Sequence, residues 1–275
     1  MQKITKNAVL AEHAKQPRRK CFFDKSGIQK DKQDNRPPSF STYIPSARKI
    51  FEAQTGLNLE WSSQFHNYWR YVSEEEITQI EEWEKQHGSL IFLRDCLSLS
   101  VALDHNLKDN VSGQYTEIGL LENNGKQNSD KEAVRKLAEI VSEKIPRLPC
   151  YKDADLICSI PSHQSKIFDL PREVTSLVSQ GIQKTDVTSG FVVKGQKEPI
   201  RGTTIDQKWD VWESAQVSFQ DPPALKIRDK KIILIDDKYQ SGITIQYIAM
   251  KLQEAGAKKI YGLSFVKTLR DTDNT

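Results

Sequence analysis

Two adjacent carboxylates, Asp236 and Asp237, follow the apolar run "IILI", which is typical of a buried strand. They precede a loop with Ser241, Gly242 and Thr244, and then an amphipathic segment. In an open parallel sheet, ligands bind beyond the carboxyl ends of the strands, which is where this pair falls. Carboxylates accept hydrogen bonds from hydroxyls or a hydrated cation, and a helix N-terminus donates N–H groups to an anion. The stretch therefore predicts a site for a sugar phosphate.

Three other interpretations of the acidic pair compete. A receiver domain needs a further acceptor aspartate and most of its domain downstream, whereas only 38 residues follow Asp237. A Walker B strand needs a G-x-x-x-x-G-K-[ST] loop, which "GQKEPIRGTT" does not match. The third interpretation is structural, because paired aspartates at a strand end can simply be solvated or cap a helix. The combination of apolar strand, acidic pair, glycine loop and amphipathic helix favours the ligand site.

Strands and helices alternate through the C-terminal two thirds of the chain. The patterns predict strands at 154–161, 190–195, 230–236 and 258–268, and helices at 131–145, 166–181 and 244–257. The apolar stretch 89–106 fits either a helix or a strand. This alternation predicts an α/β fold with a mostly parallel sheet flanked by helices. We expect this domain to span residues 96–275.

Residues 40–95 have the features of a helical accessory region. Helices are predicted at 46–56, with Ser46 as N-cap and Gly56 after its end, at 61–72, and at 73–88. Ser73 and Glu76 have the spacing of a capping box. The segment 61–72 is assigned as a helix because its aromatic residues recur at helical spacing.

Residues 1–39 form a predicted basic tail. Its first 36 residues contain ten lysines and arginines against four acidic residues. The charge fits a solvated, flexible segment, and it also fits an anchor for nucleic acid or an acidic partner protein. Both interpretations stay open.

Composition places the chain among globular, water-exposed proteins. Of its 275 residues 28% are charged and 37% hydrophobic, the formal net charge is +3, and the longest apolar runs are too short to span a membrane. No secretory signal is visible, so a cytoplasmic location is expected and a membrane partner is not. The four cysteines are widely spaced, which argues against a disulfide framework or a zinc site.

The stretch "IILIDDKYQSGIT" resembles the phosphoribosyl-pyrophosphate (PRPP) motif of type I phosphoribosyltransferases. The resemblance implies that Asp236 and Asp237 bind the ribose hydroxyls and contact Mg²⁺ indirectly, through the ligand or water. It also implies a 5-phosphate loop, made of Gln240, Ser241, Gly242, Ile243 and Thr244. The chain departs from the family at Gln240, where Thr or Ser is usual, and at Lys238, where a small or apolar residue is usual.

A weaker resemblance points to the competence-associated ComF-like branch of that family and covers about residues 100–270. It rests on "YTEIGLLENNGKQNSDKEAVRKLAEI" (115–140) and "DLICSIPSHQSK" (155–166). The second stretch implies a pyrophosphate loop over 161–166 with Ser162, His163 and Lys166 as contacts, although a lone loop histidine is also commonly just exposed. The cysteine-rich zinc module of that branch is absent.

The family reaction displaces pyrophosphate from PRPP by a nitrogenous base, and the resemblance implies this activity with Mg²⁺ as cofactor. Lys194, Lys197 and Arg201 are the cations expected to neutralise the leaving group, on a segment that is either a mobile lid or an ordinary solvated loop. A second class of function is non-catalytic. In it the pocket serves as a PRPP or nucleotide sensor or a partner-binding module, for example in a bacterial anti-phage (retron-type) or competence system.

Overall fold

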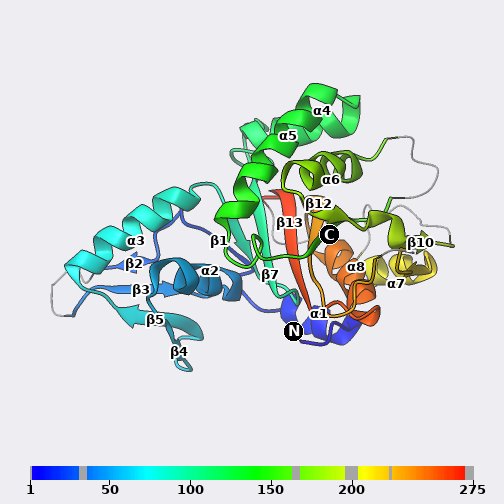
Figure 1. Cartoon of the computed structure of the whole chain (residues 1–275). Coiled ribbons are helices and arrows are strands. Elements are labelled where there is room, and N and C mark those ends of the chain that lie inside the picture. The colour runs from blue at the N-terminus through cyan, green and yellow to red at the C-terminus, as the bar shows by residue number, and fades with distance from the viewer. Residues whose placement is uncertain (1, 31–35, 163–167, 196–203, 223–224, 270–275) are drawn as a thin grey trace.

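A seven-stranded sheet forms the centre of the chain (Figure 1). The computed structural model describes residues 2–30, 36–162, 168–195, 204–222 and 225–269. In spatial order the strands are β1 (Arg19–Cys21), β6 (Ile91–Leu93), β7 (Leu99–His105), β13 (Lys259–Lys267), β12 (Lys231–Tyr239), β8 (Leu156–Ser159) and β9 (Thr185–Asp186). The strands from β7 to β9 run parallel, and β6 and β1 add an antiparallel edge. The predicted α/β fold with a mostly parallel sheet is confirmed.

Helices cover both faces of this sheet because successive side chains of its strands point to opposite sides. Ile233 and Ile235 of β12 join one core, and Ile232 and Leu234 join the other. The first face carries α4 (Glu117–Asn128), α5 (Lys131–Lys144) and α6 (Leu170–Gly181). The second face carries α1 (Lys6–His13), α7 (Ile205–Ser214) and α8 (Ile243–Glu254). Two short 3-10 helices, η1 (Ile145–Arg147) and η2 (Thr188–Gly190), complete this part.

Two smaller sheets accompany the central one. An antiparallel four-stranded sheet has the order β2 (Ile28–Gln29), β3 (Ser39–Thr42), β5 (Asn67–Tyr71) and β4 (Glu60–Ser62). Helices α2 (Pro45–Thr55) and α3 (Glu74–His87) pack on one of its faces, where Phe40 stacks on Phe51 with ring centres 4.3 Å apart. The other is a two-stranded sheet of β10 (Phe191–Val193) and β11 (Val217–Phe219).

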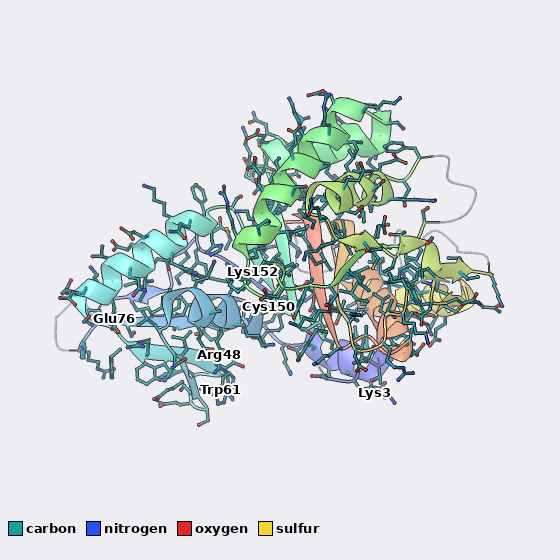
Figure 2. All side chains as sticks on the ribbon, viewed as in Figure 1. Lys3, Arg48, Trp61, Glu76, Cys150 and Lys152 are labelled. Carbon is teal, nitrogen blue, oxygen red and sulfur yellow. The ribbon has the colours of Figure 1, made fainter. Side chains whose placement is uncertain are left out.

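The predicted helix at 61–72 is wrong, because these residues form the β4–β5 hairpin. His66 adopts φ +51° at the turn, a conformation that reverses the chain. Trp61 pairs with Tyr68 across the hairpin, and Arg48, labelled near Trp61 in Figure 2, lies 4.6 Å from the centre of the Tyr68 ring. The region 40–95 is therefore mixed α and β rather than helical.

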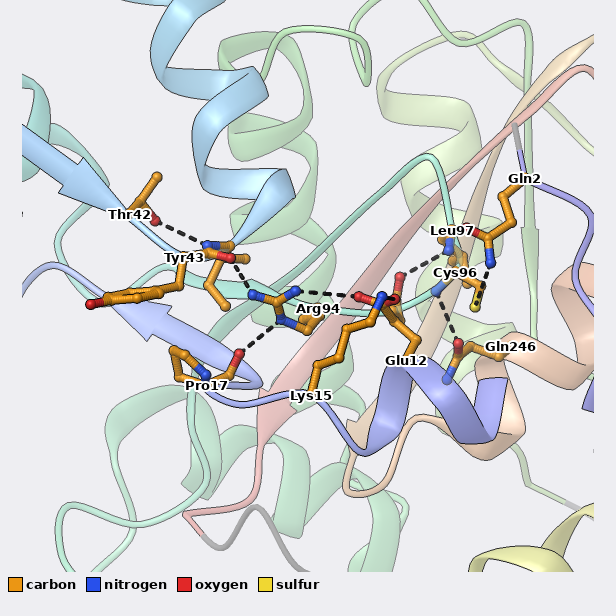
Figure 3. A network of polar contacts seen from close by, with 12 residues as sticks. Gln2, Glu12, Lys15, Pro17, Thr42, Tyr43, Arg94, Cys96, Leu97 and Gln246 are labelled. Carbon is orange, nitrogen blue, oxygen red and sulfur yellow. Dashed lines mark hydrogen bonds and ion pairs between the residues drawn. The ribbon is translucent and has the colours of Figure 1, made fainter. Parts of the chain in front are cut away.

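The N-terminal residues 2–30 are packed on the rest of the chain, so the prediction of a flexible tail is wrong for them. Ile4 and Val9 are buried in the core beside α7 and α8, and β1 pairs with β6. Arg94 fastens the segment: it donates hydrogen bonds to the Pro17 carbonyl oxygen at 2.9 Å and to the Tyr43 carbonyl oxygen (Figure 3). Apolar residues spaced through the segment outweigh its charge, because their burial stabilises the packed state.

Two helix ends were predicted correctly and one was not. Ser73 and Glu76 form the capping box of α3, and Gly56, at φ +74°, ends α2. Ser46 does not cap α2, which begins at Pro45, a residue whose fixed φ suits the first helical position. The Ser46 hydroxyl instead accepts a hydrogen bond from the Ser100 N–H at 3.1 Å.

No helix in the described ranges has the length and apolar character needed to cross a membrane. The four cysteines are all free: Cys21, Cys96 and Cys158 are buried and Cys150 is half-buried.

His87, at the end of α3, makes stability depend on pH. Burial, with a smaller effect of the Lys144 charge, lowers the pKa of this side chain to about 4. The unfolded chain therefore binds a proton near pH 6.5 while the folded chain stays neutral, so acidification favours unfolding. We expect His87 to lower the free energy of unfolding by about 2 kcal/mol between pH 7.5 and pH 4.5. Urea unfolding of the wild type and His87→Gln at both pH values checks this, and an equal loss in both proteins would contradict it.

Candidate ligand site at the β12–α8 loop

Asp236 and Asp237 lie inside β12 rather than just after it. The strand continues to Tyr239, paired with Lys267 of β13. Asp236 is buried, and its Oδ1 accepts a hydrogen bond from the Asp237 N–H at 2.9 Å. Successive residues of a strand point to opposite sides, so Asp237 faces α4, where it meets Lys126.

The loop after β12 turns directly into α8. Gly242 has φ +78°, which favours glycine, and a Cβ at this position would overlap the Tyr239 hydroxyl. The Ser241 hydroxyl accepts a hydrogen bond from the Ile243 N–H at 3.4 Å. The Thr244 hydroxyl accepts one from the Trp212 ring N–H at 3.2 Å. The first turn of α8 is thereby held in place with its N–H groups at the end of the helix, an arrangement suited to an anion.

A network of charges connects α4 to β12. Lys126 pairs with Asp237 at 2.5 Å, and Lys238 pairs with Glu122 at 3.0 Å. Lys126 also lies 3.8 Å from Glu122. Burial raises the pKa of Glu122, and the nearby Asp237 charge adds to it, while Lys238 and Lys126 act in the opposite direction. Burial alone would lower the pKa of Lys126, but the surrounding carboxylates outweigh it and the pKa is raised.

A cavity of about 300 Å³ opens between these elements. Its lining residues come from α4, the loop after β8, the start of α6, β12 and α8: Lys126, Ile160, Pro161, Ser162, Asp169, Pro171, Asp236, Asp237, Lys238 and Thr244. The cavity thus combines carboxylates, two ammonium groups and hydroxyls, a composition that fits a polar, phosphorylated ligand.

The predicted site residues are only partly brought together. Asp236, Asp237, Ser162 and Thr244 line the cavity. Ser241, Gly242 and Ile243 are buried and Gln240 is half-buried, and none of these four lines it. Lys194 is exposed at the end of β10 and does not line it. The other predicted contacts, His163, Lys166, Lys197 and Arg201, lie outside the described residues.

Sequence reasoning missed Glu122, Lys126 and Asp169. Glu122 and Lys126 stand four residues apart on α4, a spacing that puts both on one face of a helix. That spacing was the available signal, but it occurs on many solvated helices. Only the packing of α4 against β12 brings these two side chains next to the charged residues of the strand. Asp169 likewise lines the cavity because of where α6 begins.

Glu122 allows a test of this network through stability. Its carboxylate is 0% exposed and its nearest cation is Lys238. Lys238→Met should lower the free energy of unfolding by about 3 kcal/mol at pH 8, because it leaves a buried charge poorly compensated. The loss should be smaller at pH 5 than at pH 8, because the raised pKa of Glu122 lets its carboxyl group take up a proton more readily as the pH falls.

A matched control is Lys251→Met, because Lys251 also pairs with a glutamate at 3.0 Å but that partner, Glu254, is 57% exposed. We expect a loss below about 1 kcal/mol for it. Denaturant unfolding at both pH values measures these differences, and equal losses in the two variants would contradict the role given to Glu122.

The described residues include no group of three or more His, Cys, Asp or Glu side chains placed to hold a metal ion. Two carboxylates on one cavity are hard oxygen donors, which Mg²⁺ prefers, and Mg²⁺ commonly keeps several waters and binds together with phosphates. Asp236 and Asp237 therefore fit a Mg²⁺ ion that arrives with a phosphorylated ligand.

Comparisons with known proteins give similarity to solved structures alone. No protein-family model and no curated protein sequence matches the chain. It is similar to a purine phosphoribosyltransferase from Pyrococcus horikoshii Ot3 (14% identity, 52% of this chain and 86% of that one, TM-score 0.33). It is also similar to the adenine phosphoribosyltransferase from Leishmania tarentolae (8% identity, 63% of this chain and 93% of that one, TM-score 0.36). A third similar structure is the adenine phosphoribosyltransferase from Trypanosoma brucei in complex with AMP, pyrophosphate and ribose-5-phosphate (8% identity, 64% of this chain and 86% of that one, TM-score 0.37). Similarities of this size do not bear on what the chain binds or catalyses.

Proposed function

We propose that the protein binds PRPP or a nucleotide at the β12–α8 loop and transfers the phosphoribosyl group to a nitrogenous base, releasing pyrophosphate. The observation that carries the proposal is that two kinds of hydrogen-bonding group lie at one cavity. Asp236 and Asp237 line a cavity whose wall also includes Thr244, in the first turn of α8. Acceptors for vicinal hydroxyls thus stand beside donors for a phosphate.

In this proposal each group has one task. Asp236 and Asp237 accept hydrogen bonds from the ribose hydroxyls, and the loop from Gln240 to Thr244 holds the 5-phosphate. Ser162, which lines the cavity from the loop after β8, contacts the pyrophosphate. When bound, Mg²⁺ neutralises charge on the leaving pyrophosphate. The roles proposed for His163, Lys166, Lys197 and Arg201 fall on residues outside the described ranges, and Lys194 would have to approach from β10.

Lys126 adds a cation beside the acidic pair of the site. Its ammonium group already neutralises Asp237 and lines the cavity. A ligand with both hydroxyls and phosphates would engage both partners at once, because its hydroxyls donate to the carboxylate and its anionic oxygens accept from the ammonium. The ion pair would then hold both side chains in place for the ligand.

The alternative is a non-catalytic PRPP or nucleotide sensor or partner-binding module. Two observations favour it: Lys194 lies outside the cavity, and Asp237 is ion-paired within the chain. As a transferase or as a sensor, the protein would bind the same ligand. The two functions differ only in the chemical step, and we expect either of them to operate in the cytoplasm.

Calorimetry with PRPP, in the presence and absence of Mg²⁺, tests the shared part of both proposals. Release of pyrophosphate in the presence of a panel of purine and pyrimidine bases then tests catalysis. Mg²⁺-dependent binding with release supports the transferase, and binding without release supports the sensor. Absence of binding of both PRPP and a nucleoside monophosphate at millimolar concentration would overturn both.

A further inference from the structure

The four-stranded sheet β2–β3–β5–β4 has a second face, away from α2 and α3, that carries a different set of side chains. The register pairs Ser39 with Tyr71 and Ser41 with Trp69, which places these four side chains together on that outer face. Phe40, one residue along, points instead to the aromatic core with Phe51. The two faces of this sheet thus have separate environments.

A hollow of about 640 Å³ lies on the outer face. Its lining residues are Gln29, Lys30, Arg36, Pro37, Ser39, Ser41, Tyr43, Phe65, Asn67, Trp69 and Tyr71. Four of them are aromatic, two are cationic, and none of those described is acidic. Glu60, the cross-strand partner of Trp69 on the edge strand, does not line the hollow.

Three of the four aromatic side chains that line the hollow are exposed to solvent. Phe65 is 61% exposed, Tyr71 53% and Tyr43 39%. Single exposed aromatic residues are common on protein surfaces, but several gathered in one hollow mark a binding surface. Trp69 lies beside Tyr71 with ring centres 4.9 Å apart in an edge-to-face arrangement, which fixes both rings on the strand.

We propose that this outer sheet face binds single-stranded nucleic acid. Flat rings held on a sheet stack with unpaired bases, and amide and hydroxyl groups such as those of Gln29 and Ser39, which also line the hollow, can hydrogen-bond the base edges. Lys30 and Arg36 supply positive charge for the phosphates. A duplex is a poor occupant, since its bases are already stacked on each other.

Charge around the hollow supports a polyanionic occupant over a protein partner. Three of its lining residues, Gln29, Lys30 and Arg36, belong to positions 1–36, a stretch that contains ten cationic and four acidic residues. None of its lining residues belongs to the cavity at β12. The inference therefore goes beyond the proposed function, and each can fail without the other.

Fluorescence anisotropy with the full chain and labelled twelve-nucleotide oligo(dT) and oligo(U) tests the proposal. We expect saturable binding that weakens as salt rises, with a slope of log affinity against log salt of about −1.4 if two cations contact phosphates. Arg36→Gln should reduce that slope by about 0.7. Comparison of oligo(dT) with oligo(U) shows whether the surface prefers DNA or RNA, and binding of either oligonucleotide supports the proposal.

Removing the aromatic side chains separates stacking from charge. Phe65→Ala and Tyr71→Ala should each weaken binding about tenfold. Trp61→Ala is the matched control, because Trp61 is on the same hairpin and is 53% exposed like Tyr71, but it pairs with Tyr68 on the opposite face. It should leave affinity unchanged. If Tyr71→Ala does not fold, Phe65→Ala carries the same test.

Four results would overturn the proposal. One is no binding of either oligonucleotide at about 50 mM salt, where phosphate contacts are strong. Another is binding that is unchanged in Phe65→Ala and Tyr71→Ala but is abolished by heparin, because such binding would depend on charge alone. A third is an equal loss of affinity in Trp61→Ala. The last is self-association of the wild type, measured by sedimentation, that is lost in Tyr71→Ala. That result would mean that this face is an interface between two copies of the chain.

Discussion

Replacing both Asp236 and Asp237 by asparagine is expected to reduce PRPP affinity at least about a hundredfold, since a hydrogen bond to a charged group contributes about 1.5–3 kcal/mol. Both side chains line the cavity, so the loss is specific to the ligand. The fold should persist, because Lys126, left without Asp237, is 32% exposed and can reach water. Calorimetry with Mg²⁺ and PRPP measures the effect, and thermal unfolding monitors the fold.

Asp210→Asn is the matched control for this double variant. Asp210 also pairs with a lysine, Lys6, at 2.6 Å, but on α7, away from the cavity. It should leave PRPP affinity as in the wild type. An Asp236→Asn, Asp237→Asn protein that binds PRPP with unchanged affinity would remove the basis of the site.

Gly242→Val is expected to abolish PRPP binding and to destabilise the protein by roughly 3 kcal/mol. Two causes add up: valine is strained at φ +78°, and its Cβ would overlap the Tyr239 hydroxyl. To relieve the overlap, either the start of α8 or Tyr239 must move, and both hold the loop. Denaturant unfolding and calorimetry measure the two effects.

Gly56→Val separates the two causes. Gly56 has nearly the same backbone conformation, φ +74°, but no atom of the described residues lies within 4 Å of an added Cβ. It should therefore show the conformational strain alone, about 1–2 kcal/mol, with normal PRPP binding. Equal stability of the two variants, together with saturable PRPP binding by Gly242→Val, would show that the loop tolerates a side chain.

The parts of the fold that could be predicted are those that the local pattern of apolar and polar residues determines. The apolar run before Asp236, Gly242 and the amphipathic segment after it predict a strand, a turn and a helix, and β12 and α8 are found there. The continuation of β12 to Tyr239 could not be predicted, because it depends on pairing with β13, which lies farther along the chain.

Other features depended on packing between distant segments. The aromatic residues of 61–72 fit a helical period and a strand period alike, and only pairing of Asn67–Tyr71 with β3 decides between them. Lys126 and Glu122 acquire a role only because α4 packs beside β12. Burial of Ile4 and Val9 likewise required a partner surface that the N-terminal composition does not reveal.

The N-terminal segment has a consequence for how ligand binding could be observed. Arg18 donates a hydrogen bond to the Ser241 carbonyl oxygen at 2.6 Å, and the Ile4 N–H donates one to Gln253 of α8 at 2.8 Å. Whatever steadies the β12–α8 loop must therefore also steady residues more than two hundred positions upstream. Slower amide hydrogen exchange across residues 2–21 would then report occupancy of a pocket that those residues do not line.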